Sequence, residues 1–169
     1  QAGASIVNDV TALEGDPQSL EVIAASTVSV ILMHMQGKPE SMQDSQVYKD
    51  VVSEVQEYLL SRVKACESAG VERNRIALDP GIGFGKTHKH NLTLMKNLSA
   101  FTTLGSPLVL GVSRKSFIGK ISNENDPAKR LAGSLSAGLA GLARGVSILR
   151  VHNVWETRQA IDVWEAIKK

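Results

Sequence analysis

Short apolar runs rich in β-branched residues recur along the chain, and each is followed by a stretch with apolar residues at helical spacing. The runs are 5–7, 28–33, 76–78, 108–112 and 146–151. Such runs predict buried β-strands, and the stretches after them predict helices. The predicted helices are 17–25, 47–69, 91–101, 127–144 and 155–167, with Asp126 as the N-cap of the fourth. The chain therefore reads as five strand-and-helix units.

This alternation predicts an α/β fold with a mostly parallel sheet and helices outside it. An open doubly wound sheet would fit, and so would part of a closed barrel, whose eight units need roughly 250 residues. Every predicted strand turns polar at its C-terminal end: Asn8 with Asp9, His34 with Gln36, Asp79, 113–116 and 150–153. Barrels build their sites from all strand ends, whereas open sheets use two or three. The pattern favours the C-terminal five βα units of a TIM-type (β/α)8 barrel, with the first three units absent.

The opening residues, "QAGASIVNDV", indicate where in the domain the chain begins. They contain no initiator Met, and Gln-Ala-Gly is typical of the last turn of a helix that ends just before a strand. We therefore expect a single domain over residues 1–169, a partial barrel that lacks its N-terminal third.

The composition is that of a globular domain without a nucleic-acid or membrane partner. Of 169 residues, 43% are hydrophobic and 4% aromatic, and the net charge is +2, so neither a strongly basic surface nor a base-stacking platform is expected. No apolar run approaches the roughly 18 residues of a membrane span. The lone cysteine, Cys66, lies in a helical pattern, which predicts a packing residue, no disulfide within the chain and a reducing, cytoplasmic location.

A glycine-rich loop follows the third predicted strand in "RIALDPGIGFGKTHKHN". It resembles a phosphate-binding loop, but Pro80 stands where the Walker pattern needs its first glycine, so nucleotide hydrolysis is not indicated. Two readings of Asp79 remain open. The carboxylate caps the turn, or it accepts hydrogen bonds from a cationic or amidine-like ligand edge where Gly81, Gly83 and Gly85 let a flat ligand approach the backbone.

Cationic residues follow the last two predicted strands in "GVSRKSFIG" and "ILRVHN". The adjacent Arg114 and Lys115 are either solvated surface or part of an anion site. Period-two alternation puts Arg150 and His152 on one side of their strand. Because barrels commonly bind phosphate at their last strands, we expect phosphate oxygens to be bound by Ser113, Lys115, Arg150 and His152.

Three further features are ambiguous in the sequence. His34 lies on the other side of its strand from Met33, and a structural, hydrogen-bonded imidazole is the simpler reading. The segment 87–90 carries two histidines without a nearby cysteine or carboxylate, so we expect an exposed loop. Trp155 and Trp164, on the final predicted helix, are most simply packing residues.

Five motifs together resemble the dihydropteroate synthase family, over the chain from about residue 5 to its end. They are "IVNDV", "LMHMQG", "LDPGIGFGK", "GVSRKSFIG" and "RVHNV", in the family's order and at similar spacing. The resemblance implies a barrel that condenses 6-hydroxymethyl-7,8-dihydropterin diphosphate with p-aminobenzoate, releasing pyrophosphate in folate biosynthesis. It also implies a sulfonamide target, a Mg²⁺ cofactor and a homodimer through C-terminal helices.

The resemblance also assigns roles to residues of this chain. The pterin's aminopyrimidine edge would be bound by Asn8 and Asp79, and the opposite polar side of the ring by Lys115. The flat slot would be lined by Met33, Phe84 and Gly111, the diphosphate would be bound by Arg150 and His152, and p-aminobenzoate would lie near Ser116. Ser113 joins the substrate-binding set, and the catalytic roles go to Lys115, Arg150 and His152.

Departures from the family pattern limit what this chain is expected to do. The Asn that helps bind Mg²⁺ and a mobile loop over p-aminobenzoate belong to the absent units, so no metal ligand is expected in this chain. The family usually has a glycine near Ala12. Two alternatives stay open: a pterin-binding methyltransferase domain, and a non-catalytic fragment that associates with another chain.

Overall fold

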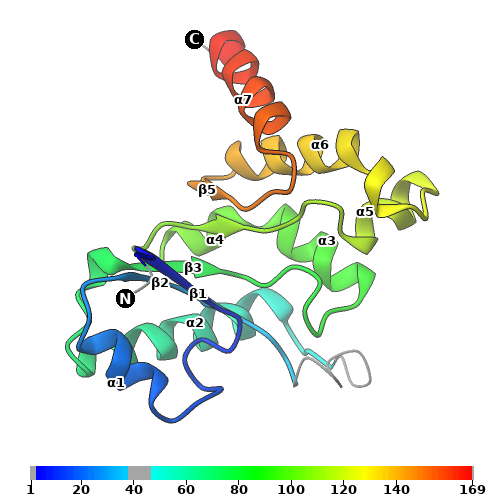
Figure 1. The fold of residues 1–169 in the computed structure, drawn as a ribbon. Helices are drawn as coiled ribbons and strands as arrows, with labels where there is room; N and C mark the ends of the chain where they lie inside the picture. The colour runs from blue at the N-terminus through cyan, green and yellow to red at the C-terminus, as the bar shows by residue number, and fades with distance from the viewer. Residues whose placement is uncertain (1–2, 38–46, 169) are drawn as a thin grey trace.

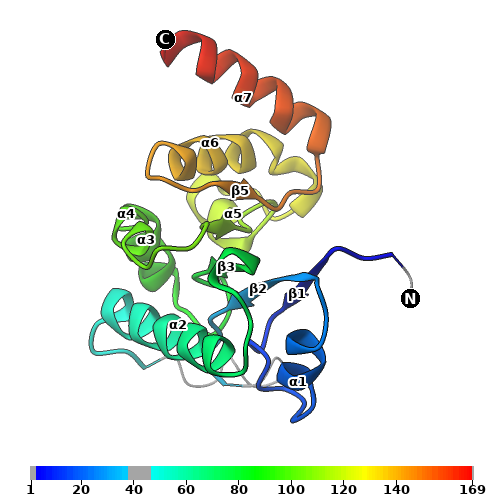
Figure 2. The same cartoon turned by 90° about the vertical axis from the view of Figure 1, so that its left-hand side faces the viewer.

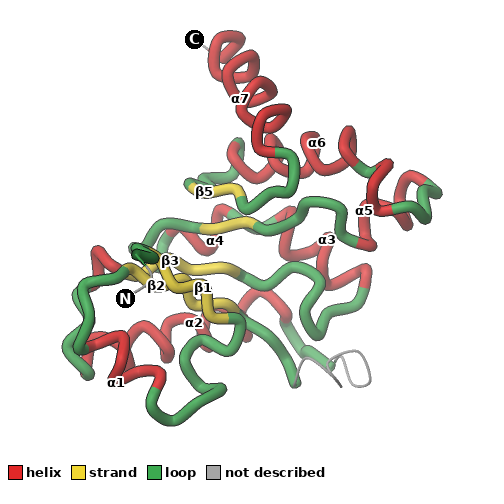
Figure 3. Tube along the Cα trace, viewed as in Figure 1, coloured by secondary structure: helices red, strands yellow, loops and turns green. Residues whose placement is uncertain are grey.

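The computed structural model describes residues 3–37 and 47–168. Its strands are β1 (Ile6–Asp9), β2 (Ser29–Met33), β3 (Ile76–Asp79), β4 (Val109–Leu110) and β5 (Ile148–Leu149). Its helices are α1 (Ser19–Ala24), α2 (Val51–Ser68), α3 (His88–Lys96), α4 (Ser99–Thr102), α5 (Ser116–Ser122), α6 (Leu131–Leu142) and α7 (Val154–Lys168). Short 3₁₀ turns lie at Arg73–Arg75 and Pro127–Lys129. Strands and helices alternate as the sequence predicts (Figure 3).

The strands are parallel and lie side by side in chain order. One sheet has the order β1-β2-β3 and a second pairs β4 with β5. A single parallel bridge between Leu78 and Leu108 connects the two sheets. A doubly wound sheet reverses its strand order at a switch point, and the described strands do not. Helices α2, α3, α4 and α6 follow one another around one side of the strands (Figures 1 and 2).

The main core lies between the strands and these helices. Along β2, Val30 and Leu32 belong to this core, so alternation sends Ile31 and Met33 to the opposite, inner face of the sheet. On α2 the side chains of Val55, Leu59, Val63 and Cys66 are buried, at the spacing of one helical face. Burial raises the pKa of the Cys66 thiol, as expected of a packing residue.

Helix α2 begins where its first turn is capped. The Asp50 side chain accepts hydrogen bonds from the backbone N–H groups of Val52 and Ser53, which satisfies donors that have no partner within the helix. The predicted helix 47–69 is therefore confirmed, with its start moved to Val51.

Several element predictions need correction. The segment 87–90 is not an exposed loop: Thr87 caps α3, its side chain accepting from the His90 N–H, and His88 opens the helix. The predicted helix 91–101 is two helices, α3 and α4. The predicted helix 127–144 is a 3₁₀ turn followed by α6, and Asp126 caps only the turn, through Ala128. Helix α5 was not predicted at all.

The fifth strand and the final helix also differ from expectation. Only Ile148 and Leu149 form ladder pairs, with Val109 and Leu110, so the predicted run 146–151 is strand over two residues. Trp155 is 79% exposed and is not a packing residue within the described chain. Positions nine apart on a helix lie on opposite faces, which is why Trp164 is half-buried while Trp155 is exposed.

The inner face of the sheet is open at the N-terminal ends of the strands. A largely apolar cavity there has residues of β1, β2, β3 and β5 among its lining, including Ile6, Ile31, Ala77 and Ile148. Ile6, on the edge strand β1, is 55% exposed. In the described part of the chain, no helix combines the length and apolar character needed to cross a membrane.

Candidate functional site

Strand register places three of the predicted site residues on the inner face. Asn8 pairs with Ile31, and Met33 pairs with Asp79. Paired residues of neighbouring parallel strands point to the same side, and residues two apart on one strand do likewise. Asn8, Met33 and Asp79 therefore share the inner face at the C-terminal ends of β1, β2 and β3. Asn8 is exposed, and Met33 and Asp79 are buried.

Asp79 is a buried carboxylate at the end of β3, with 2% of its surface exposed. Its Oδ1 accepts a hydrogen bond from the Gly81 N–H at 2.8 Å. Burial raises the pKa of Asp79, while the Gly81 hydrogen bond and the charges of Lys115, Arg150 and Lys86 oppose the rise. The turn-capping reading is thus correct for one oxygen. Among the described residues no hydrogen bond is recorded for the other oxygen, which leaves it available to a ligand.

The glycine loop after Asp79 is folded tightly against the end of β2. Gly81, Gly83 and Gly85 all have positive φ, at 68°, 84° and 61°, a conformation that glycine adopts without steric cost. A Cβ on Gly81 would collide with the carbonyl oxygen of His34. The Asn91 Oδ1 accepts from the Gly83 N–H at 2.7 Å, so helix α3 holds the loop from the other side.

Lys86, the last residue of this loop, turns inward. Its Nζ lies 2.8 Å from His34 Nδ1, and 3.0 Å from the carbonyl oxygens of both Gly81 and Phe84. Burial, and then the charge of Lys86, lower the pKa of His34 to about 3. The imidazole is therefore neutral, and His34 has the structural, hydrogen-bonded role that the sequence favours.

Lys115 lies across the glycine loop. Its Nζ is 4.4 Å from the centroid of the Phe84 ring and donates to the Ile82 carbonyl. A Cβ on Gly83 would lie 3.2 Å from the Lys115 side chain. Burial lowers the pKa of Lys115 to about 8, with the charge of Asp79 opposing and that of Arg150 adding to the shift. Phe84, Lys115 and Asp79 are thus brought together as predicted.

The ends of β4 and β5 form a second group. A Cβ on Gly111 would lie 2.6 Å from the Arg150 Nη2, so the guanidinium packs directly on the Gly111 backbone. The Ser113 Oγ accepts from the His152 N–H at 3.3 Å and lies 3.0 Å from His152 Nδ1. At these two strand ends Arg150 thus meets Gly111, and His152 meets Ser113.

Arg114 leaves the site although it precedes Lys115 in sequence. Its φ is 62°, and its Nη2 donates to Asn153 Oδ1 at 2.8 Å. Its backbone N–H donates to the Ser134 Oγ at 2.9 Å. Arg114 therefore ties the loop after β4 to the loop after β5, and only Lys115 of the adjacent pair faces Asp79.

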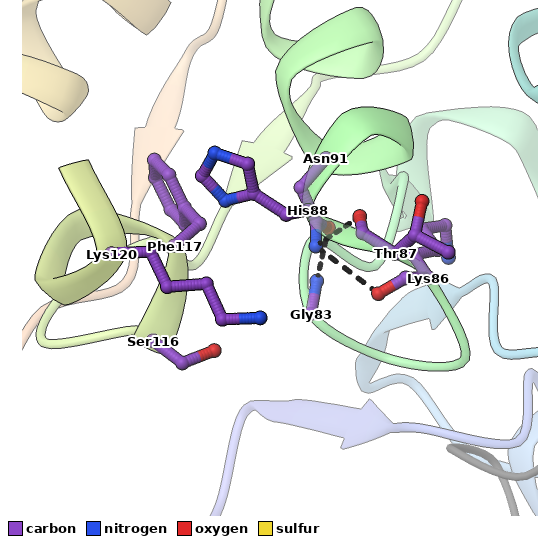
Figure 4. A pocket seen from close by; sticks show the side chains of 8 residues that line it. All are labelled: Gly83, Lys86, Thr87, His88, Asn91, Ser116, Phe117 and Lys120. Atoms are coloured by element: carbon purple, nitrogen blue, oxygen red, sulfur yellow. Dashed lines mark hydrogen bonds between the residues drawn. The ribbon is translucent and has the colours of Figure 1, made fainter.

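Ser116 lines a polar cavity of about 130 Å³ between α3 and α5, which Gly83 and Lys86 of the glycine loop also line. Ser116, Phe117 and Lys120 on α5 face His88 and Asn91 on α3 across this space (Figure 4). Its volume is below the roughly 300 Å³ at which small-molecule pockets usually begin. The cavity can hold one polar end of a ligand whose body lies elsewhere.

The site carries more positive than negative charge. Asp79 is a buried carboxylate, and the charges of Lys115, Arg150 and Lys86 all act on it. An anionic ligand would offset this excess. Across residues 3–37 and 47–168, there is no group of three or more His, Cys, Asp or Glu side chains arranged to hold a metal ion.

Sequence reasoning missed two residues that shape this site. Lys86 entered only as part of the failed Walker pattern, and Asn91 only as the start of a predicted helix. A lysine directly after Gly-x-Gly-x-Gly could have signalled an inward cation, because such a loop brings backbone carbonyls close together. Nothing in the local pattern marks the Asn91 amide as a partner of Gly83.

Comparisons with known proteins agree on one group. The family model described as "Pterin binding enzyme" matches residues 1–152. A dihydropteroate synthase of Neisseria meningitidis serogroup C is 48% identical over 98% of this chain and 59% of its own length. The solved dihydropteroate synthase of Xanthomonas albilineans in complex with 7,8-dihydropteroate superposes with a TM-score of 0.91 at 40% identity, covering 98% of this chain and 62% of that one.

A third relative is the Yersinia pestis dihydropteroate synthase, solved as a sulfonamide drug complex. It superposes with a TM-score of 0.94 at 38% identity, over 98% of this chain and 60% of that one. The chain thus spans about three fifths of the length of these relatives.

Proposed function

This chain belongs to the pterin binding enzyme family, and on that premise we propose that it forms part of a dihydropteroate synthase. The proposed reaction joins 6-hydroxymethyl-7,8-dihydropterin diphosphate to p-aminobenzoate and releases pyrophosphate, a step of folate biosynthesis. The observation that carries the proposal is the buried Asp79 carboxylate, which lies beside a glycine loop and among three cations. One ligand with an N–H edge and an anionic end would satisfy both features.

In the proposed pterin site, the free oxygen of Asp79 accepts from the aminopyrimidine edge. Asn8 adds a second polar contact from two strands away, about 10 Å across the sheet and two residues, about 7 Å, back along the strands. Lys115 bonds the opposite polar side of the ring, and Met33, Phe84 and Gly111 line the slot. The shared inner face of Asn8, Met33 and Asp79 supports this arrangement.

In the proposed reaction, the C–O bond between the pterin methylene and the diphosphate breaks, and pyrophosphate leaves with the electron pair. The cationic methylene, conjugated to the pterin, is attacked by the amine of p-aminobenzoate, which then loses a proton. Lys115, Arg150 and His152, with Ser113, stabilise the departing anion, while Asp79 and Asn8 hold the ring in place. No protein nucleophile is needed.

The second substrate and the metal complete the proposed site. In the proposal p-aminobenzoate binds near Ser116, with its carboxylate in the polar cavity between α3 and α5. Sulfonamides would compete with it for this position. Mg²⁺ on the diphosphate would neutralise part of its charge. We place its protein ligand among residues that precede the matched segment in the longer relatives.

We further propose that the five units are the last five of a (β/α)8 barrel. The chain order of the strands and the apolar cavity at their N-terminal ends support this, since three more units would close the wall and cover the cavity. The protein would be a homodimer through α7, where exposed apolar side chains include Trp155, Val163 and Ile167. A cytoplasmic location is proposed from the lone free cysteine.

Two alternatives are less well supported. A pterin-binding methyltransferase would not need the cluster of Ser113, Arg150 and His152, which suits a diphosphate. A non-catalytic fragment that associates with another chain would stay inactive even after the residues that precede the match in the longer relatives are restored, and an activity assay of that longer chain distinguishes it.

Asp79→Asn tests the proposal. The substitution is made in an extended chain, in which the residues that precede the match in the Neisseria meningitidis relative are fused to this sequence. Affinity for 6-hydroxymethylpterin should fall by roughly 1.5–3 kcal/mol, the range for a hydrogen bond to a charged group. Calorimetric titration measures it, with Asp162→Asn on the exposed face of α7 as the control. Unchanged affinity would rule out the proposed role of Asp79.

A further inference from the structure

Lys86 is a buried cation for which the proposed reaction has no use. Only 3% of its surface is exposed, and a buried ammonium is costly unless its donors are satisfied. An ammonium has three N–H donors, and the three closest acceptors of Lys86 are Gly81 O, Phe84 O and His34 Nδ1, with the His34 carbonyl oxygen farther away at 3.4 Å. The fit of three donors to three acceptors accounts for a lysine at this position.

These acceptors connect Lys86 to the residues that face the ligand. The Gly81 carbonyl accepts from Lys86 at 3.0 Å, and the Gly81 N–H donates to Asp79 Oδ1 at 2.8 Å. The peptide groups on both sides of Gly81 are thus held, one by Lys86 and one by Asp79. The Phe84 carbonyl is held at 3.0 Å, which fixes the residue whose ring lies under Lys115.

The charges around Lys86 are compatible with this role. His34 is neutral, because burial lowers its pKa to about 3, and its Nδ1 can therefore accept from an ammonium. Burial also lowers the pKa of Lys86, to about 7, with Asp79 opposing this shift and Lys115 adding to it. The protonated side chain keeps all three hydrogen bonds.

We propose that Lys86 is a positioning residue for the pterin: its ammonium holds residues 80–85 in the conformation that orients Asp79 and Phe84 toward the ligand. This inference rests on the proposed function and goes beyond it. Lys86 would then control pterin affinity without touching the pterin, because its N–H donors are bonded to protein atoms.

Lys86→Met in the extended chain is the test, with Lys89→Met as its matched control, because Lys89 is exposed in the first turn of α3, three residues after Lys86. Calorimetry uses two probes, 6-hydroxymethylpterin and inorganic pyrophosphate. Pterin affinity should fall about tenfold, the equivalent of one orienting hydrogen bond. Pyrophosphate affinity should stay within about twofold, because of its proposed ligands only Lys115 touches this loop, and Ser113, Arg150 and His152 do not. Lys89→Met should change neither.

Chemical rescue separates positioning from general damage to the fold. Lys86→Ala removes three carbons and the amine, and propylammonium carries the same atoms. Adding propylammonium should restore pterin affinity to Lys86→Ala, whereas tetramethylammonium, which has no N–H donor, should not. Equal losses for pterin and pyrophosphate, absence of rescue, or unchanged pterin affinity in Lys86→Met would overturn the inference. Failure of the unsubstituted extended chain to bind pterin would instead overturn the proposed function.

Discussion

Arg150 and Gly111 come from different strand ends and share one small space. The guanidinium lies where a side chain on residue 111 would be, because a Cβ there would approach Nη2 to 2.6 Å. The backbone N–H of Arg150 donates to the Leu110 carbonyl at 3.0 Å, which continues the hydrogen bonding between β4 and β5. An arginine held in this way presents a planar fork of N–H donors whose geometry matches phosphate oxygens.

Arg150→Ala in the extended chain should weaken binding of inorganic pyrophosphate by roughly 1.5–3 kcal/mol, the range for hydrogen bonds to charged groups. Binding of 6-hydroxymethylpterin, which lacks phosphate, should change little. Calorimetry with both ligands measures the difference, and Arg158→Ala on the exposed face of α7 is the control. If both ligands lose the same affinity, Arg150 is structural. His152→Ala should follow Arg150→Ala more weakly, because an imidazole offers at most two N–H donors and a guanidinium offers five.

Some of these residue roles can be predicted from sequence and others cannot. Alternation along a strand fixes which side a residue takes, so Arg150 could be assigned to the side opposite Leu149, which packs on the core. Alternation does not apply in loops. The sequence left the adjacent Arg114 and Lys115 open between solvated surface and an anion site, and the positive φ of Arg114 sends its side chain to Asn153. Lys86 was missed because two of its three close acceptors are backbone carbonyls, which the sequence does not display.

At the scale of elements, α7 differs from the other helices. Of its 15 residues only Thr157 is buried, whereas five of the 18 residues of α2 are, and the helix projects away from the strands (Figure 1). Trp155, Val163 and Ile167 are exposed on one face, and Ile167 is 80% exposed. Large apolar side chains grouped on one face are typical of interaction surfaces.

Trp155→Glu combined with Ile167→Glu should turn the proposed dimer of the extended chain into a monomer. Two charges at the centre of an apolar contact would have to be desolvated without partners. Sedimentation velocity measures the change in mass, and circular dichroism checks that helix content is kept. Val22→Glu, at another exposed apolar position on α1, should leave the dimer intact. A double variant that stays dimeric would place the interface elsewhere.

Element types could be predicted more reliably than element lengths. The apolar face of α2 and the apolar run of β2 are long enough for the sequence pattern to predict a helix and a strand there. The last strand is shorter than its apolar run, because ladder pairing stops after Leu149, where the chain turns toward Ser113. Helix α5 begins inside "GVSRKSFIG", a segment that the sequence marks for its charges rather than for any periodicity.

At the scale of the whole molecule, the strands of the described chain form open parallel sheets rather than a closed barrel. Its first strand presents an edge with Ile6 exposed, and Ile148 on β5 is also exposed. A cavity of about 200 Å³ lies open between their N-terminal ends. Unpaired strand edges and open apolar surface both favour association with other chains.

The 169-residue chain alone should show no measurable dihydropteroate synthesis and should be oligomeric or aggregated. Without the metal ligand and the loop that the family resemblance assigns to residues before this segment, the rate should fall on the order of a thousandfold. A coupled assay with both substrates and gel filtration of the same sample measure the two outcomes. The extended chain is the positive control. A monomer with turnover near that of the extended chain would contradict this expectation.

Among the described residues, the parallel bridge between Leu78 and Leu108 is the one strand pairing that joins the β1-β2-β3 sheet to the β4-β5 sheet. Asp79 and the glycine loop lie on one side of it, and Lys115, Arg150 and His152 lie on the other. A ligand that contacts Asp79 and Arg150 together would connect the two sheets. Ligand affinity and the rigidity of the two sheets relative to each other would then be coupled, because a ligand that contacts both sheets also resists their relative movement.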